Sequence, residues 1–238
     1  MKMGKGTDTL FDSRETEESK AVRKMFQGVD RVETLAEKFV MHPGECGEHV
    51  RRTREITKYL LKSTPAGENI TPELAGQIDI GVILHDVGKL VIPASILKKS
   101  GKLTCEEYEI VKTHTIHGTE LLKKIPCFES HPAFDCVYDI VRHHHERWDG
   151  RGYPDGLKGN EISACVQVMS MADVYDALVT KRTYKDAYDH DKAVQMMVDG
   201  ECGTFNPEML QYFLDVEPEL RKFYEDRSNR KETNGNQE

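Results

Sequence analysis

A helical spacing of apolar residues runs through nearly all of the chain between about residue 30 and residue 226. Alternating apolar and polar residues, which would predict strands, are scarce over the same span. The spacing predicts an all-α bundle. Its helices are expected at 45–63, 72–88, 104–125, 134–146, 162–180, 190–199 and 207–226, with breaks where glycine and proline gather.

The two ends of the chain are more polar than the middle. Residues 1–30 are predicted to be a polar lead-in that becomes helical toward its end, and residues 31–226 to form the main domain. Residues 227–238 contain almost no apolar side chain, so we expect a disordered tail there. Inside the domain, Thr104 followed by Glu107 predicts a capping box at the start of a helix.

Composition excludes several classes of partner. The formal net charge is −8 and no basic block could follow a long nucleic acid backbone. No apolar run approaches the roughly 18 residues that a membrane helix needs, so no membrane span is expected. Six cysteines are scattered without a CxxC pair, which argues against a disulfide framework or a zinc finger and suits a reducing cytoplasm.

Histidines stand on the interior faces of four predicted helices. Each residue advances about 100° around a helix, so the apolar positions show which face is buried. By this criterion the inward histidines are His49, His85, His114 and His144. Further ionisable side chains lie close to the same faces, namely Glu45, Asp86 and His145.

One inward histidine is usually an ordinary core residue, but four together with carboxylates need another explanation. Ionisable groups that converge in an apolar interior are costly unless they are paired or bind a metal. Imidazole and carboxylate suit iron, manganese and zinc, and bundle cores hold dinuclear sites of this composition. We therefore predict a metal centre. His143 is expected to point away from it, and His117 to be mainly structural.

The same residues occur, in order, in the motifs "ECGEHVRRT", "LHDVGKLVIPASIL", "KTHTIHG", "HHERWDGRGYPDGLKG" and "MADVYDALVTKRTYK". With these motifs the chain resembles the HD-GYP family of cyclic dinucleotide phosphodiesterases, a branch of the HD metal-dependent phosphohydrolases, over about residues 44–215. The resemblance implies an HD-domain helical bundle with an added GYP loop and C-terminal helices. Residues 31–226 would then be the HD-GYP catalytic domain.

The resemblance also implies a set of metal ligands. They are Glu45, His49, His85, Asp86, His114, His144, His145 and Asp173. Helix periodicity does not separate Asp173 from Asp176, so the resemblance alone selects Asp173. Two or three divalent ions are expected, iron first and manganese otherwise, and the presence of Glu45 favours three. The first motif departs from the usual Arg-Asp-x-Glu-Thr-Gly, and it lacks the aspartate and threonine that would support Glu45.

The expected reaction is hydrolysis of cyclic di-GMP to linear pGpG, with further cleavage to GMP left open, by a hydroxide that bridges the metals. Asp86 is expected to bridge two ions, and Lys89 to stabilise charge on the phosphate or to protonate the leaving oxygen. The substrate-binding residues are expected to be Arg182, Lys185, Tyr153 and Asp176.

Other functions stay open at this stage. The substrate could be another cyclic dinucleotide, such as the mixed GMP–AMP ring, or a simple nucleotide. The chain could also be a non-enzymatic module that binds a cyclic dinucleotide or docks a partner. A diguanylate cyclase, a sensor protein and a second copy of the chain are the candidate partners, and the GYP loop could be a cover for the site, a surface turn or a docking surface.

Overall fold

The computed structural model of the protein describes residues 16–40, 45–63, 70–181 and 186–235. These residues form helices joined by turns, and the only β-pairing among them is one isolated bridge between Asp149 and Lys158. The predicted all-α fold is therefore confirmed for the part of the chain that is described.

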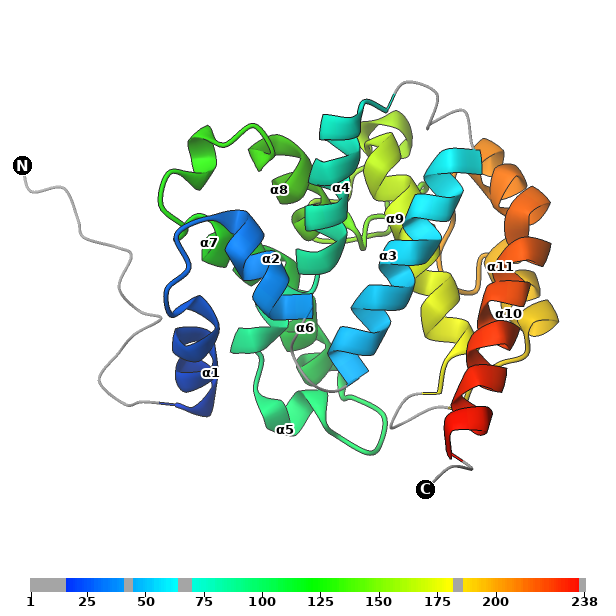
Figure 1. Ribbon diagram of the computed structural model, residues 1–238, viewed down its shortest axis with the longest axis horizontal. Coiled ribbons are helices and arrows are strands. Elements are labelled where there is room, and N and C mark those ends of the chain that lie inside the picture. The colour runs from blue at the N-terminus through cyan, green and yellow to red at the C-terminus, as the bar shows by residue number, and fades with distance from the viewer. Residues whose placement is uncertain (1–15, 41–44, 64–69, 182–185, 236–238) are drawn as a thin grey trace, which may run out of the picture.

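The order of the helices along the chain can be followed in Figure 1. The α-helices are α1 (Glu17–Phe26), α2 (Val32–Val40), α3 (Glu45–Ser63), α4 (Pro72–Leu84), α5 (Ala94–Leu97), α6 (Cys105–Lys112), α7 (His114–Leu122), α8 (Phe134–His143), α9 (Ala164–Val179), α10 (His190–Val198) and α11 (Pro207–Gly235). Short 3₁₀ turns are η3 (Val87–Val91), η4 (Phe128–Ser130) and η5 (Gly159–Glu161).

Two hydrophobic clusters fill the interior. The first joins α3, α4, α8 and α9 to α10 and α11, and the second joins α1 and α2 to α3, α4, α7 and α8. In Figure 1 α1, α2 and α7 lie on one side of the molecule and α10 and α11 on the other, with α3 and α4 between them. Helices α3, α4 and α8 therefore contribute to both clusters and connect the halves of the core.

Side-chain caps mark several helix starts. The predicted capping box is confirmed: Thr104 Oγ1 accepts from the amide of Glu107, and the Glu107 carboxylate accepts from the amide of Thr104. Thr71, Ser163 and Asp189 cap α4, α9 and α10 in the simpler way, each accepting one amide hydrogen of the first turn.

Two predicted helices end earlier than expected. The helix expected at 72–88 stops at Leu84, and the chain continues through a turn into η3. The helix expected at 104–125 is broken at Thr113, whose hydroxyl donates to the carbonyl of Ile110 at 2.6 Å. Periodicity could not reveal these breaks because the apolar spacing continues across them.

Both ends of the described chain are helical. Helix α1 lies where the lead-in was expected to become helical, and it packs on the fold through Val22 and Met25, both buried, of which Met25 joins the second cluster. The disordered tail expected at 227–238 is wrong for most of its length, since α11 runs on to Gly235. Arginine, lysine and glutamate in this stretch favour helix, and extending an existing helix is much easier than starting one.

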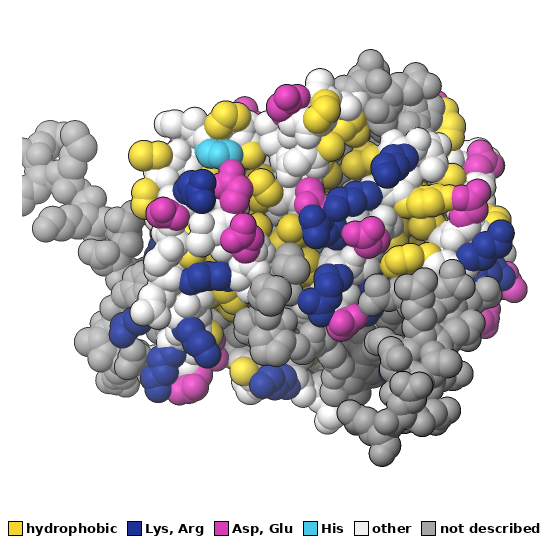
Figure 2. All heavy atoms as spheres, viewed as in Figure 1, with side chains coloured by type: hydrophobic (Ala, Val, Ile, Leu, Met, Phe, Trp, Pro, Cys, Tyr) yellow, Lys and Arg dark blue, Asp and Glu magenta, His cyan; other side chains and the backbone are white. Residues whose placement is uncertain are grey.

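The surface carries both signs of charge. Figure 2 shows basic and acidic side chains intermixed on the face that presents α3 and α4. Ion pairs on this face join Arg51 to Glu48, and Arg54 and Lys58 to Asp79. None of the described helices is long and apolar enough to cross a membrane.

The backbones of η3 and α7 pack so closely at Gly88 that a glycine-to-alanine substitution tests the contact. A Cβ at Gly88 would lie 1.8 Å from the carbonyl oxygen of His114, whereas a Cβ at Gly76, exposed on α4, would meet nothing within 4 Å. Gly88→Ala should lower the free energy of unfolding by about 3 kcal/mol, because backbone atoms must move. Gly76→Ala should raise it by up to about 1 kcal/mol. Urea unfolding measures both, and equal stability of the two variants would contradict the packing described.

Candidate metal centre

The predicted ligands that the structure describes come together from five helices. His49 lies on α3, Asp173 lies on α9, and the other five stand at helix ends: His85 and Asp86 directly after α4, His114 at the start of α7, and His144 and His145 directly after α8. Glu45 begins α3, but its side chain lies outside the described residues.

Three of the histidines are oriented by the ends of the helices before them. The last carbonyls of an α-helix have no partner within it. Here a carbonyl of the last helical turn accepts from the Nδ1–H of the histidine that follows the helix, and the carbonyl of Ile140 also accepts from the backbone amide of His144. The pairs are His85 with Val82 at 2.7 Å after α4, His114 with Val111 at 2.7 Å after α6, and His144 with Ile140 at 3.1 Å after α8.

This arrangement decides which ring nitrogen is available. A carbonyl can only accept, so Nδ1 carries the hydrogen and Nε2 keeps its lone pair. The three Nε2 atoms all face the centre of the site. The helix ends also bring their partial negative charge toward it, which favours a cation.

His49 is held differently. Its Nδ1 donates to Asp176 at 2.6 Å, and its Nε2 lies 3.0 Å from Asp173. Burial opposes protonation, but the hydrogen bonds to Asp173 and Asp176 outweigh it and raise the pKa of His49 to about 9. The proton on Nε2 stands where a cation shared by His49 and Asp173 would replace it.

His114, His144 and His145 are neutral at physiological pH. Burial lowers the pKa of His114 to about 4 and holds the pKa values of His144 and His145 well below the usual range. Burial alone would raise the pKa of Asp86, but Lys89 and His85 hold it well below its usual range. The site therefore combines neutral imidazoles with an ionised carboxylate, which are the forms that bind metals.

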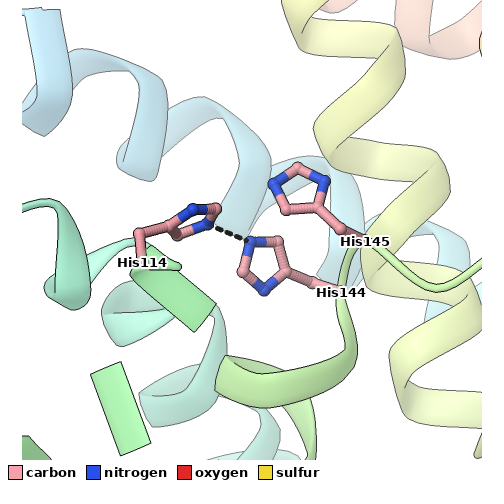
Figure 3. Close-up of side chains that lie close together, drawn as sticks. All are labelled: His114, His144 and His145. Atoms are coloured by element: carbon pink, nitrogen blue, oxygen red, sulfur yellow. Dashed lines mark hydrogen bonds between the residues drawn. The ribbon is translucent and has the colours of Figure 1, made fainter. Parts of the chain in front are cut away.

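Several buried atoms in the site have no partner that satisfies them. His85 Nε2 and Asp86 Oδ1 make no hydrogen bond despite complete burial of both atoms. The Nε2 atoms of His114 and His144 are 3.2 Å apart, and Figure 3 shows these rings and that of His145 turned toward one another. Two lone pairs at this distance repel unless a cation lies between them. The residues present therefore fit bound metal ions.

The donor atoms fall into three overlapping groups, each with ligand atoms within 4.8 Å of one another. His85 and His144 each belong to two groups. The groups are His49 with His85 and Asp173, His85 with Asp86 and His144, and His114 with His144 and His145. Shared ligands of this kind suit more than one ion.

The GYP loop, which contains Gly152, Tyr153 and Pro154, is anchored by hydrogen bonds to Glu146, the residue after His145. Glu146 is buried, and its carboxylate accepts from the amides of Asp155, Gly156 and Leu157 at 2.7, 3.0 and 3.0 Å. Gly152 lies so near that a Cβ there would be 2.3 Å from Glu146 Cα. The loop thus needs glycine at this position for close approach of two backbone segments.

His143, as predicted, points away from the metal ligands and supports the same loop. Its ring nitrogens contact Asp139 at 2.6 Å and Asp155 at 2.8 Å. Arg142 forms a bidentate ion pair with Asp155, in which Nε and Nη2 donate to the two carboxylate oxygens at 2.6 and 2.7 Å. Tyr153 of the loop stacks on the predicted ligand His145 with ring centroids 4.7 Å apart, so the loop reaches the edge of the candidate metal site.

Lys89 also lies at the edge of the site. Its Nζ is 2.6 Å from Asp86 Oδ2, and its side chain remains 34% exposed. Lys89 therefore lies next to Asp86, and η3, not a continued helix, places it there.

Asp176 does not face substrate, contrary to the prediction. It is fully buried, and its carboxylate accepts from His49, from Arg52 Nε at 2.6 Å and from the Tyr224 hydroxyl at 2.6 Å. Both oxygens are occupied, so Asp176 positions His49. The error arose because Asp173 and Asp176 lie about one turn apart on α9, and spacing alone does not show which is nearer the centre.

Sequence reasoning missed Arg52, Glu146 and Tyr224. Arg52 follows His49 by three residues and so shares its helix face, which was a usable signal. Tyr224 lies on α11, far from Asp176 in sequence, and nothing in its local sequence indicated the hydrogen bond between them. Two predicted substrate residues, Arg182 and Lys185, lie outside the described residues.

Comparisons with known proteins agree with this geometry. An HD domain family model matches residues 33–208. A cyclic di-GMP phosphodiesterase of Vibrio cholerae is 36% identical over 216 residues, which cover 89% of this chain and 43% of the relative. A 3′3′-cGAMP-specific phosphodiesterase 2 of the same organism is 33% identical over 171 residues, 72% of this chain and 31% of the relative. The chain spans less than half the length of these curated relatives.

A solved structure shares the fold. It is an HDG"Y"P protein of Bdellovibrio bacteriovorus, with a TM-score of 0.60 and 16% sequence identity. The match covers 91% of this chain and 75% of that one.

The role of Asp176 can be measured through metal affinity. Asp176→Asn keeps the shape of the side chain but removes the charge that holds His49, so metal affinity should fall about tenfold to 100-fold, as for other residues that support ligands. Asp79→Asn, which removes a surface partner of Arg54, is the control. Titration of metal-free protein gives the dissociation constants, and unchanged affinity in Asp176→Asn would contradict the assigned role.

Proposed function

Because the chain belongs to the HD domain family and carries the motifs of its HD-GYP branch, we propose that its metal centre hydrolyses cyclic di-GMP to linear pGpG, with GMP as the product of a second cleavage. The observation that carries the proposal is the convergence of buried Nε2 and carboxylate atoms that have no satisfying partner, with Tyr153 of the GYP loop stacked on His145. A cyclic dinucleotide fits because its phosphodiester needs concentrated positive charge, which divalent ions held at this centre would supply.

The ions would be held by the three ligand groups, with Glu45 as a further proposed ligand. Bound divalent ions supply a Lewis acid for the phosphodiester and a hydroxide at neutral pH. Asp86 can serve two positions, because Oδ1 faces His114 at 3.4 Å while Oδ2 faces His85 at 3.3 Å. This supports the bridging role expected for Asp86.

Lys89 is proposed to act on the phosphate directly. In the free enzyme the Lys89 ammonium forms an ion pair with the Asp86 carboxylate. When substrate is bound, the partly exposed Lys89 side chain can turn toward a phosphate oxygen or the leaving 3′ oxygen. Tyr153 is proposed to line the substrate pocket next to His145. Arg182 and Lys185 follow α9, which carries Asp173, and we keep them as proposed phosphate or guanine contacts.

A substrate with one adenine is the second candidate. The similarity to a 3′3′-cGAMP-specific phosphodiesterase over 72% of this chain supports it. The mixed ring has the same phosphodiester bonds, so the metal ligands would be identical and the bases alone would decide.

We also propose that the chain works in the cytoplasm, because its free cysteines suit reducing conditions. Its proposed protein partners are a diguanylate cyclase, a sensor protein and a second copy of the chain. If the GYP loop binds such a partner, Glu146 would still hold the loop in place from inside the protein.

Metal identity is a prediction of its own. Imidazole and carboxylate donors without a described thiolate suit iron or manganese, and protein purified without oxygen should contain one of them in two or three equivalents per chain. Elemental analysis measures the content. A preparation that is active only with a different metal would contradict the assignment.

The activity itself is tested with metal-loaded protein and a panel of cyclic di-GMP, the mixed GMP–AMP ring and cyclic di-AMP. We expect cyclic di-GMP to have the highest kcat/KM. Asp86→Ala should abolish turnover, whereas Asp215→Ala, at an exposed site on α11, should not change it. Hydrolysis by Asp86→Ala at the wild-type rate would rule out the proposed centre, and a preference for the mixed ring would favour the second candidate.

A further inference from the structure

A row of side chains leads outward from the metal centre across α6. It begins with the ligand His145, on which Tyr153 stacks at 4.7 Å. The Nζ of Lys112 lies 5.2 Å from the Tyr153 ring centroid and 5.9 Å from the Tyr108 ring centroid. The row therefore continues from His145 through Tyr153 and Lys112 to Tyr108.

The outer end of this row is open to solvent. Tyr108 is 50% exposed and belongs to neither hydrophobic cluster. The Lys112 side chain, one helical turn later, is 28% exposed. An aromatic ring with a cation beside it can bind a nucleobase by stacking and an adjacent phosphate by charge.

We propose that Tyr108 and Lys112 form an outer subsite for the second nucleotide of a cyclic dinucleotide, the base stacking on Tyr108 and the uncleaved phosphate accepting from Lys112. This inference rests on the proposed function. A cyclic dinucleotide has two phosphodiesters separated by one nucleoside on each side. When one is at the metals, the other has to lie further out, and Tyr153 and Lys112 occupy the path between the metals and Tyr108.

Glu109 regulates how available Lys112 is. Its two carboxylate oxygens are both 3.0 Å from Lys112 Nζ, and its side chain is 66% exposed. An exposed ion pair of this kind is weak, so a phosphate can take the place of the carboxylate. Removing the charge of Glu109 should therefore strengthen binding of the dinucleotide.

The chain offers a matched control for Lys112. Lys123 pairs with Glu120 at 3.2 Å, and its Nζ lies 5.5 Å from the Tyr138 ring centroid. It repeats the same arrangement of lysine, glutamate and tyrosine, but it stands beyond the end of α7 opposite to His114. A general effect of losing a cation near a tyrosine would appear equally in both places.

The test compares two substrates. We assay metal-loaded wild-type protein, Tyr108→Ala, Lys112→Met and the controls Tyr212→Ala and Lys123→Met with cyclic di-GMP and with bis(p-nitrophenyl) phosphate, which has a phosphodiester but no second nucleotide. Tyr212 is the control for Tyr108: it lies on α11, and its hydroxyl donates to Glu208 one turn earlier. In Tyr108→Ala and in Lys112→Met, kcat/KM for cyclic di-GMP relative to the small diester should fall about tenfold, which lies within the range of one base stack. Glu109→Gln should raise the ratio.

Calorimetric binding of a phosphorothioate analogue of cyclic di-GMP gives a second readout. Its Kd should rise about tenfold in both subsite variants and stay at the wild-type value in both controls. An unchanged ratio and an unchanged Kd in the subsite variants would overturn the subsite. If wild-type protein cleaves only the small diester, the proposed function fails and the Kd values alone decide the subsite. Wild-type protein that neither cleaves nor binds the dinucleotide would overturn both.

Discussion

The hydrogen bonds from histidine Nδ1 to helix-end carbonyls organise the rest of this protein. Each bond ends on a carbonyl in the last turn of a helix and, in the same contact, turns Nε2 toward the centre. Three helices must therefore end just before His85, His114 and His144. This geometry requires α4 and α6 to end early, which periodicity did not predict. The three helix ends place three partial negative charges around a site suited to cations.

Further support comes from side chains that are not themselves predicted ligands. Asp176 joins His49 to Arg52 and, through Tyr224, to the last helix, so that α11 contributes to the position of a ligand it does not touch. Glu146 holds the GYP loop in position, because its carboxylate accepts from the backbone amides of Asp155, Gly156 and Leu157. Both carboxylates are buried and fully hydrogen-bonded, which makes the surroundings of the metal site rigid.

Much of the site could be predicted from the sequence because a helix converts residue spacing into direction. His49, His85, His114 and His144 were selected by their place among apolar residues, and all four meet. Asp173 could be chosen over Asp176 only by resemblance, because the two are about one turn apart on a helix that is buried on most sides. The reversed role of Asp176 is a question of distance across the bundle, on which local spacing carries no information.

The sequence by itself determined that the chain is helical and that imidazoles and carboxylates share its interior, since both follow from which residues recur every three or four positions. The tertiary structure alone decided where helices stop, which nitrogen of each histidine is free, and which side chains continue outward past Tyr153. Those features depend on contacts between segments far apart in the chain. Lys112 and Tyr108 became a candidate subsite only when the fold carried the GYP loop against α6.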